Sequence, residues 1–402
     1  MAALSELDLP LLDYTDPALR GPAFHPRMAE LRAQGWLAAT PLGYVVLERD
    51  AAAHFLRSRA AEFPGMKIAE IFGIEDGPLY EEMRRNILHI NGGDHARLRG
   101  LVNPSFTPRA AERWRPAMRA FMGELLDAAL AGDGAVDFVA AVAKPYPSLV
   151  IATVLGAPLE DAPRLHEWSN WVQRQFDAPT LMAERPRIER HVVELYDYLD
   201  ALLAARRDDP ADDLISTLIA ARFEGDKLSD AELVNLVLNV LVGGVDTTQS
   251  QLAQGIRLFA EHPDQWDRVR ADPDAMVPRA VEEILRYEPI TPFTARIVEE
   301  ELVYRDVVFP VDTVVMVCAF TGNRDPGEPD VFDVAAEREG KPLTFGAGIH
   351  YCLGANLARA ELQEALAFLA RRWTRIELDG EPVMGSINGI YGIDRLPIRW
   401  TA

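Results

Sequence analysis

The sequence predicts a mainly helical protein with small β-sheets, in the class called α+β. Three observations support this fold class. Apolar residues recur at three- and four-residue spacing over most of the chain. One such pattern, from Ser229 to about His262, spans more than 30 residues. Short β-rich segments gather near both ends of the chain, which places the sheets outside the helical part.

The N-terminal half begins with strands and continues with helices. The segment Trp36 to Leu47 is typical of two short strands around a turn at Pro41-Leu42-Gly43. Helical spacing then follows in Ala110–Leu130, Pro186–Arg206 and Asp212–Phe223. We therefore expect helices to dominate this half.

The longest helix has a clear start and a clear end. Ser229 and Glu232 have the spacing of a capping box. The apolar pattern ends at about His262, ahead of Pro263, after roughly 50 Å of helix at about 1.5 Å per residue. Its middle, LVNLVLNVLVGGV, is apolar on nearly every side, so we expect it to run through the interior.

The C-terminal half alternates between helix and strand. A helix is expected over Asp274–Arg286, an irregular stretch over Gly322–Pro342, and a last helix over Leu353–Arg372 before a β-like tail. Short strands are expected between the first of these helices and the irregular stretch, at Ala295–Val298, Leu302–Tyr304, Val307–Phe309 and Thr313–Cys318.

Composition excludes several classes of function. The net charge of −21 argues against nucleic acid and anionic membranes as partners, because both attract clustered cations. The two cysteines, Cys318 and Cys352, cannot form a disulfide framework or a four-cysteine zinc site. The start, MAALSELDLP, lacks the features of a signal peptide, and no apolar run approaches the roughly 20 residues of a membrane span. We expect a cytoplasmic protein.

Cys352 lies in a glycine-rich segment, FGAGIHYCLG. Gly346, Gly348 and Gly354 would let the backbone approach a large flat ligand. The following helix start would favour a thiolate, which is an iron ligand in haem enzymes that cleave the O–O bond. The alternative is a small buried thiol, the commoner state of a lone cysteine. A dinucleotide loop is excluded, because GxGxxG would need glycine in place of Tyr351.

A second unusual segment, LVGGVDTT, lies inside the long helix. Gly243 and Gly244 each cost about 1 kcal/mol in a helix interior, so they need a reason such as space for a ligand. Thr247 is four residues after Gly243, and its hydroxyl can bond that carbonyl. Asp246 with Thr247 would suit a proton relay. The alternative is that the polar face of the helix simply returns at 246 to 250.

The cysteine segment resembles the haem-binding loop of the cytochromes P-450, Phe-x-x-Gly-x-x-x-Cys-x-Gly, matched at Phe345, Gly348, Cys352 and Gly354. The resemblance implies haem b whose iron is ligated by Cys352. Phe345 and Gly346 would lie against the haem on the sulfur side. His350 would bond a haem propionate.

The glycine-containing helix is similar to the oxygen-activating helix of the same family. The haem would therefore lie between this long central helix and the cysteine loop with its helix. Gly243 and Gly244 would leave room for O₂, Asp246 would deliver protons, and Thr247 would position water or oxygen.

Other motifs resemble those of the family in the expected order. Glu283 and Arg286 match its Glu-x-x-Arg pair, although surface pairs at this spacing are common. His95 and Arg99 match a haem-flanking helix, and with Arg296 they would bond propionates; each could otherwise be a solvated cation.

One stretch departs from the family pattern. In Phe332-Asp333-Val-Ala-Ala336, alanine stands where the family has arginine, and Pro342 stands near the place of a histidine. We consider Arg338 as the substitute partner of the Glu-x-x-Arg pair.

The resemblance covers about residues 20 to 400 and implies one domain over 1–402. Within it we expect a β-containing part at about 20–60, a helical haem part at about 90–290, and a part with strands, irregular stretch, cysteine loop and last helix at about 290–402.

The implied function is a monooxygenase that hydroxylates or epoxidises a hydrophobic small molecule with O₂. Electrons would come from NAD(P)H through a ferredoxin reductase and a ferredoxin, which would dock on a basic patch of Arg97, Arg109, Arg113 and Arg115. Two alternatives are a peroxide-driven oxygenase and a non-catalytic haem-binding or carrier-docking module. We expect a monomer.

The substrate pocket is expected, by family position, to draw on five apolar segments. These are 66–88, 168–182, the helix near Leu241, 290–293 and 387–391. Its candidate residues are apolar, which suggests a hydrophobic ligand without defining its class: Ile71, Phe72, Trp171, Phe176, Leu241, Ile290, Phe293, Ile387 and Ile390.

Overall fold

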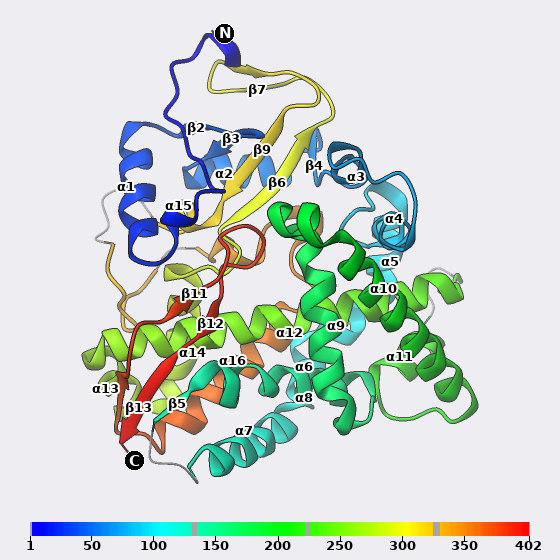
Figure 1. Ribbon diagram of the computed structural model, residues 1–402, viewed down its shortest axis with the longest axis vertical. Coiled ribbons are helices and arrows are strands. Elements are labelled where there is room, and N and C mark those ends of the chain that lie inside the picture. The colour runs from blue at the N-terminus through cyan, green and yellow to red at the C-terminus, as the bar shows by residue number, and fades with distance from the viewer. Residues whose placement is uncertain (1, 131–134, 222–224, 325–329, 339, 402) are drawn as a thin grey trace.

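The computed structural model describes residues 2–130, 135–221, 225–324, 330–338 and 340–401. A strand-rich part that contains the N-terminus lies at one end, and a larger helical part makes up the rest (Figure 1). Phe223, at the end of one expected helix, and parts of the irregular stretch after Gly322 lie outside the described residues. The mainly helical class with small sheets is confirmed.

Helix α12 (Asp230–Glu261) crosses the middle of the molecule (Figure 1). The hydroxyl of Ser229 accepts the N–H of Glu232, whose carboxylate accepts the N–H of Ser229, so the expected capping box is present. By length and composition α12 could cross a membrane, but 67% of its apolar window is buried inside the protein. It is therefore a core helix, as its all-round apolar pattern predicted.

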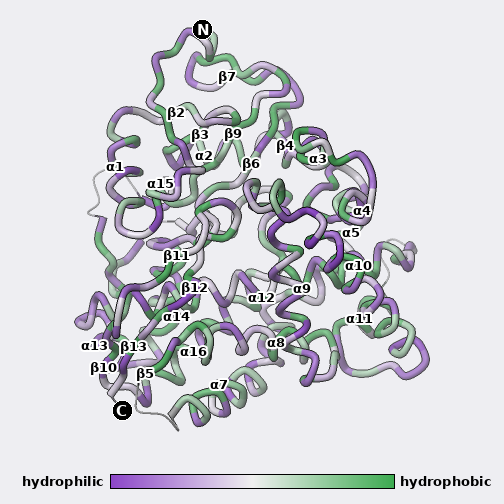
Figure 2. Tube along the Cα trace, viewed as in Figure 1, coloured by the Kyte–Doolittle hydropathy of each residue, from purple (hydrophilic) through white to green (hydrophobic). Residues whose placement is uncertain are grey.

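Several helices pack against α12 and fix its position, among them α8 (Pro145–Leu155), α9 (Ala162–Gln173), α14 (Pro273–Tyr287) and α16 (Ala355–Ala370). The remaining helices surround this centre, and outer helices such as α7 alternate between hydrophobic and hydrophilic residues (Figure 2). They are α1 (Phe24–Gln34), α2 (Arg49–Arg57), α3 (Lys67–Ile71), α4 (Pro78–Arg85), α5 (Gly92–Val102), α6 (Pro108–Glu112), α7 (Arg115–Leu130), α10 (Ala178–Asp208), α11 (Leu214–Ala220), α13 (Pro263–Ala271) and α15 (Ala319–Gly322).

The largest sheet has the strand order β2-β3-β9-β6-β4. Strands β3 and β9 are parallel, and the other neighbours are antiparallel. The sheet joins the N-terminal hairpin to strands after α14. The β-rich sequences predicted the single strands but not this pairing. Its strands are β2 (Leu37–Thr40), β3 (Gly43–Val46), β4 (Ala61–Glu62), β6 (Phe293–Val298) and β9 (Val314–Cys318).

Three smaller sheets complete the fold, with orders β1-β8-β7, β10-β13-β5 and β11-β12. Strand β5 lies between helices in the sequence and pairs with the C-terminal strand, so no local pattern predicted it. The strands are β1 (Ala2–Ala3), β5 (Ala135–Asp137), β7 (Leu302–Tyr304), β8 (Val307–Phe309), β10 (Arg375–Leu378), β11 (Val383–Met384), β12 (Ile393–Arg395) and β13 (Pro397–Thr401).

Candidate active site

A cavity of about 800 Å³ lies between the cysteine loop and α12. Cys352, Phe345 and Gly354 line one side, and Gly243 and Thr247 line another. Cys352 is exposed although it lies inside the molecule, because the surface next to its thiol belongs to this cavity. The structure thus brings together the two segments that the sequence singled out.

The cysteine loop is held in shape by its own backbone. The N–H of Cys352 donates to the carbonyl of Phe345 at 2.9 Å. Gly346 and Gly348 have φ values of 70° and 74°, in the left-handed region that favours glycine. A Cβ at Gly348 would lie 2.6 Å from the carbonyl oxygen of Leu56. Glycine is therefore required at Gly348 by the approach of a neighbouring segment as well as by the turn.

The groups around Cys352 shift the pKa of its thiol in opposite directions. Burial raises the pKa of its thiol, while the N–H groups of Gly354 and Ala355 and the charges of Arg99 and Arg359 lower it. The net direction is upward. The N–H groups before α16 lower the pKa, as the position of Cys352 predicted, but they do not by themselves offset burial. A bound metal cation would supply the missing stabilisation of the anion.

The glycines of α12 open the opposite wall. Gly243 is exposed between buried Val242 and half-buried Gly244, and a Cβ built on it would meet nothing within 4 Å. The hydroxyl of Thr247 donates to the carbonyl of Gly243 at 2.6 Å, as the four-residue spacing predicted. Gly243 and Thr247 therefore share the face of α12 that looks into the cavity.

Asp246 points away from this cavity, toward α9. Its carboxylate accepts hydrogen bonds from the Ser169 hydroxyl at 2.9 Å and the Asn170 amide at 3.1 Å. His166 Nε2 lies 3.8 Å from it. Burial raises the pKa of Asp246, and His166 and the two donors oppose that rise.

The α9 partners of Asp246 were not found by sequence reasoning. His166, Ser169 and Asn170 precede Asp246 by more than 70 residues and reach it only because α9 packs on α12. His166 Nε2 also lies 2.8 Å from Gln249 Oε1, one turn from Asp246 along the helix. No motif marks these residues, so only the packed structure reveals them.

Four basic side chains gather at the edge of the cavity: His95, Arg99, Arg296 and His350. Arg296 is only 3% exposed, and burial lowers its pKa to about 10. Its guanidinium donates to the carbonyl of Ala295 at 2.8 Å, and no ion pair to it is found within the described residues. A buried cation without a counter-charge is costly, so this edge suits an anionic group.

The two histidines extend this basic edge. The rings of His95 and His350 lie 4.4 Å apart between centroids. Burial lowers the pKa of His350 to about 3, helped by the nearby positive charges of His95, Arg296 and Arg99. Its Nε2 lies 2.7 Å from Asn91 Oδ1, whereas its Nδ1 is buried without a hydrogen-bond partner in the described structure.

These observations fit the haem that the resemblance implies. An open thiol faces the cavity, glycines on two walls leave space for a flat group, and uncompensated cations at the edge match its carboxylates. Cys352 would ligate the iron, and the four basic residues would hold the carboxylates.

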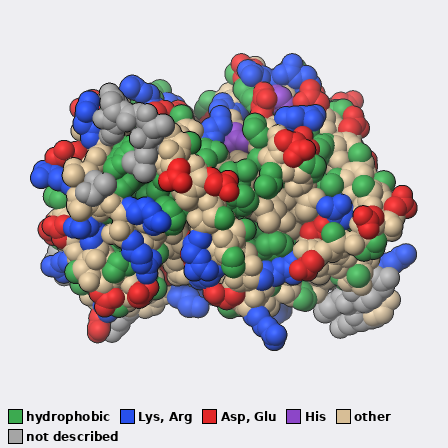
Figure 3. All heavy atoms as spheres, turned by 90° about the horizontal axis from the view of Figure 1, so that it is seen from below, with side chains coloured by type: hydrophobic (Ala, Val, Ile, Leu, Met, Phe, Trp, Pro, Cys, Tyr) green, Lys and Arg blue, Asp and Glu red, His purple; other side chains and the backbone are tan. Residues whose placement is uncertain are grey.

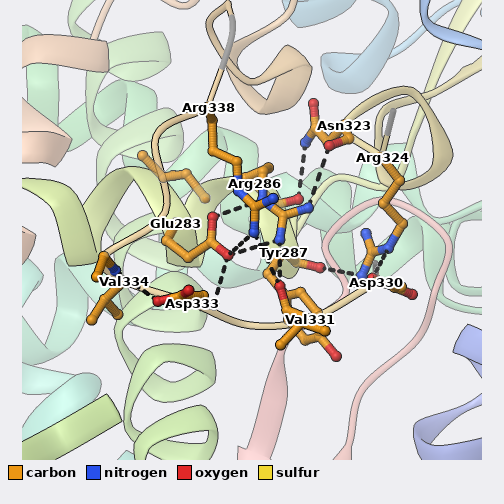
Figure 4. A network of polar contacts seen from close by, with 12 residues as sticks. Glu283, Arg286, Tyr287, Asn323, Arg324, Asp330, Val331, Asp333, Val334 and Arg338 are labelled. Carbon is orange, nitrogen blue, oxygen red and sulfur yellow. Dashed lines mark hydrogen bonds and ion pairs between the residues drawn. The ribbon is translucent and has the colours of Figure 1, made fainter. Parts of the chain in front are cut away.

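Glu283 and Arg286 form a buried ion pair, with side chains 4% and 9% exposed (Figure 4). The guanidinium of Arg286 contacts both carboxylate oxygens, at 2.7 and 2.8 Å. Arg338 donates to Glu283 Oε1 at 3.1 Å, and the N–H of Asp333 donates to the same oxygen at 2.9 Å. Arg338 thus makes the contact that we considered for it in place of an arginine at Ala336.

Most of the apolar pocket candidates line the cavity: Ile71, Phe72, Phe176, Ile290, Phe293, Ile387 and Ile390. Two lie elsewhere. Trp171 stacks on His191 and under Arg187. Leu241 is fully buried in α12 away from the cavity-facing stripe, which recurs at three- and four-residue spacing through Val240 and Gly244.

Comparisons with known proteins agree with this site. The family model described as Cytochrome P450 matches residues 41–383. Luteothin monooxygenase from Streptomyces thioluteus is 37% identical over 399 residues, which cover 98% of this chain and 97% of that protein. Mycinamicin IV hydroxylase/epoxidase from Micromonospora griseorubida is 34% identical over 325 residues, or 80% and 77% of the two chains. The crystal structure of CalO2 has a TM-score of 0.90 at 30% identity and covers 98% of this chain and 99% of its own.

Proposed function

Since the chain belongs to the cytochrome P450 family, we propose that it inserts one atom of O₂ into a hydrophobic small organic substrate, by hydroxylation or epoxidation. It is a P450 monooxygenase, like its relatives. The observation that carries the proposal is the meeting of Cys352, Gly243 and Thr247 around one cavity. The haem, when bound, supplies the iron and the redox chemistry of O₂ activation.

The residues around the cavity have two proposed roles, which are to hold the haem and to fix the segment before the cysteine loop. Cys352 would hold the iron, Arg99 and Arg296 would neutralise the haem carboxylates, and His95 and His350 would donate hydrogen bonds to them. Phe345 lies beside Cys352 with Arg359 over its ring, at 4.6 Å from the centroid. Glu283, Arg286 and Arg338 tie the segment before the cysteine loop to α14.

Proton supply is the proposed task of Asp246 and Thr247. Thr247 presents its hydroxyl to the cavity, where it can hold water or O₂. Asp246 is bound on the α9 side, where its raised pKa favours proton uptake. We propose that rotation of its side chain carries a proton from the His166 side toward Thr247, which avoids opening the cavity to bulk water.

Electrons are proposed to come from NAD(P)H through a ferredoxin reductase and a ferredoxin. Arg97 is bound by Asp226 and Glu232, and Arg115 by Glu112 and Glu364, so these two cations are largely neutralised. Arg109 and Arg113 are exposed, although Arg113 pairs with the exposed Asp212 at 3.1 Å, and they are the better docking candidates. Basic and acidic side chains are also interspersed on the face seen in Figure 3. We propose a cytoplasmic monomer.

One experiment separates the proposal from its alternatives. The haem-loaded protein is supplied with NADH, a ferredoxin pair, ¹⁸O₂ and a library of hydrophobic compounds chosen by their effect on the ferric spectrum. We expect products that carry one ¹⁸O atom. Product formation with hydrogen peroxide but not with NADH would instead indicate a peroxide-driven oxygenase, and haem binding without any product would indicate a non-catalytic module.

A further inference from the structure

Two asparagines interrupt the apolar part of α12. Asn235 is only 1% exposed, and Asn239 lies one turn later, half-buried, in the wall of the cavity. Asn239 is in turn one helical turn before Gly243, which is about 6 Å along the helix axis. Polar amides in a helix that is otherwise apolar need hydrogen-bond partners, and these partners decide which atoms face the cavity.

The bonds around Asn239 use both hydrogens of its amide. Its Nδ2 donates to the carbonyl oxygen of Asn235 at 2.7 Å and to Asn235 Oδ1 at 2.8 Å. Asn235 is fixed in turn, because its Nδ2 donates to the hydroxyl of Tyr196 at 2.8 Å. This chain of bonds sets the orientation of the Asn239 amide. Within the described residues no group donates to its acceptor, Oδ1, which is left for a group in the cavity.

The α12 wall that carries Asn239 is uncharged. Of the described residues that line the cavity, those of α12, of 173–178 and of 387–390 include no ionisable side chain. A charged ligand group beside Asn239 would be desolvated without a counter-charge, which is costly. A neutral O–H or N–H donor would instead gain a bond to an acceptor that is already oriented.

We infer that Asn239 determines substrate specificity, because its Oδ1 accepts a hydrogen bond from a neutral hydroxyl or amide N–H of the substrate. The donor lies about one helical turn from the opening at Gly243, measured along α12. The substrate class is therefore an uncharged, mainly apolar molecule with a hydrogen-bond donor at a fixed distance from the oxidised position. This inference rests on the proposed function, since it places the reacting part of the substrate beside Gly243.

The test uses probes that bind iron through an imidazole and so need no known substrate. The haem-loaded protein is titrated with N-(ω-hydroxyalkyl)imidazoles of increasing chain length and with the methyl ethers of the same compounds, and the Soret shift is followed. At one chain length we expect the hydroxyl probe to bind about 3- to 10-fold more tightly than its ether, the range for one neutral hydrogen bond. In Asn239→Leu this preference is lost.

Two further variants separate the role of Asn239 from general effects on the pocket. Asn235→Leu keeps Asn239 and the backbone acceptor at 235 but removes the side-chain acceptor of Asn239 Nδ2. A donor then becomes available to the cavity, so the ether should gain affinity relative to the hydroxyl probe. Val240→Ala changes an apolar neighbour in the same wall and should keep the preference. The inference is overturned if hydroxyl and ether bind equally at every length, if the preference survives in Asn239→Leu, or if ammonium- or carboxylate-ended probes bind best. Lack of a Soret shift with any probe would contradict the haem site itself.

Discussion

The hydroxyl of Thr247 donates to the carbonyl oxygen of Gly243 at 2.6 Å, so one hydrogen bond joins the two residues that open α12 to the cavity. Because the hydroxyl hydrogen is donated to the helix backbone, the lone pairs of the Thr247 oxygen are left to accept a hydrogen bond from the cavity. It also occupies a carbonyl of the helix ladder at the exposed glycine, which is where a local opening of the helix costs least.

Replacement of Thr247 by alanine removes that hydroxyl without adding bulk. We expect Thr247→Ala to consume NADH at a rate within a few-fold of the parent but to release more hydrogen peroxide per product, because water and protons are no longer positioned. Thr247→Ser keeps the hydroxyl and should restore most of the coupling. The ratio of peroxide to product measures this, and an unchanged ratio in Thr247→Ala would rule out the role.

The raised pKa of Glu82 predicts that the stability of the protein depends on pH. It is fully buried, its Oε1 accepts from Asn86 at 2.7 Å, and burial raises its pKa from 4.5 to about 7. Between pH 4.5 and 7 the folded protein therefore binds more protons than the unfolded chain. Stability falls as pH rises through this window, by up to about 3 kcal/mol, and stays low above it.

Glu82→Gln removes this titration and keeps an acceptor for Asn86. We expect the variant to be about 1–3 kcal/mol more stable than the parent at pH 8 and nearly equal to it at pH 5. Unfolding is measured at both pH values. Glu81→Gln, on the exposed side of the same helix, should show no such gain at pH 8. A gain that is equal at both pH values would contradict the assignment.

The contact between Arg338 and Glu283 predicts that removal of the Arg338 side chain destabilises the protein. Its guanidinium is the second one on the buried Glu283 carboxylate, and Arg286 remains when it is removed. Arg338→Ala should therefore cost about 1–3 kcal/mol and speed the loss of haem. Arg268→Ala, which breaks an exposed pair with Asp333 at 3.4 Å, should cost less than about 1 kcal/mol. Equal costs in thermal unfolding would show that Arg338 has no special part.

The electron donor provides a test at the surface. Arg109→Ala combined with Arg113→Ala should slow reduction by ferredoxin severalfold at low salt, and high salt should slow the parent in the same way. Arg371→Ala, which removes an exposed arginine from the end of α16, serves as the control. The reduction rate is measured by stopped flow. A rate that changes neither with salt nor in the double variant would place the docking surface elsewhere.

The sequence predicted the elements whose signals are local. The capping box at Ser229, the hairpin before Leu47 and the glycine turns at Gly346 and Gly348 are short-range patterns, and the structure shows each of them. Contacts between distant segments could not be predicted in this way. Strand β5 and the α9 partners of Asp246 depend on packing between segments far apart in the chain.

The candidate site shows the same division. Spacing along α12 correctly placed Thr247 against Gly243, but the side from which Asp246 is bound depends on α9. Leu241 missed the cavity because one residue along a helix turns the side chain by about 100°. The electrostatics of Cys352 could not be predicted in full, because burial, which sequence does not reveal, opposes the N–H groups before α16.

The central claim is that Cys352 holds the haem iron. The most direct test is the ferrous–carbon monoxide spectrum of the parent, Cys352→Ser and Cys318→Ala, since Cys318 is the second cysteine and is buried away from the cavity lining. We expect the parent and Cys318→Ala to show the red-shifted Soret band of thiolate ligation and Cys352→Ser to lack it. Retention of that band in Cys352→Ser, or its loss only in Cys318→Ala, would contradict the claim.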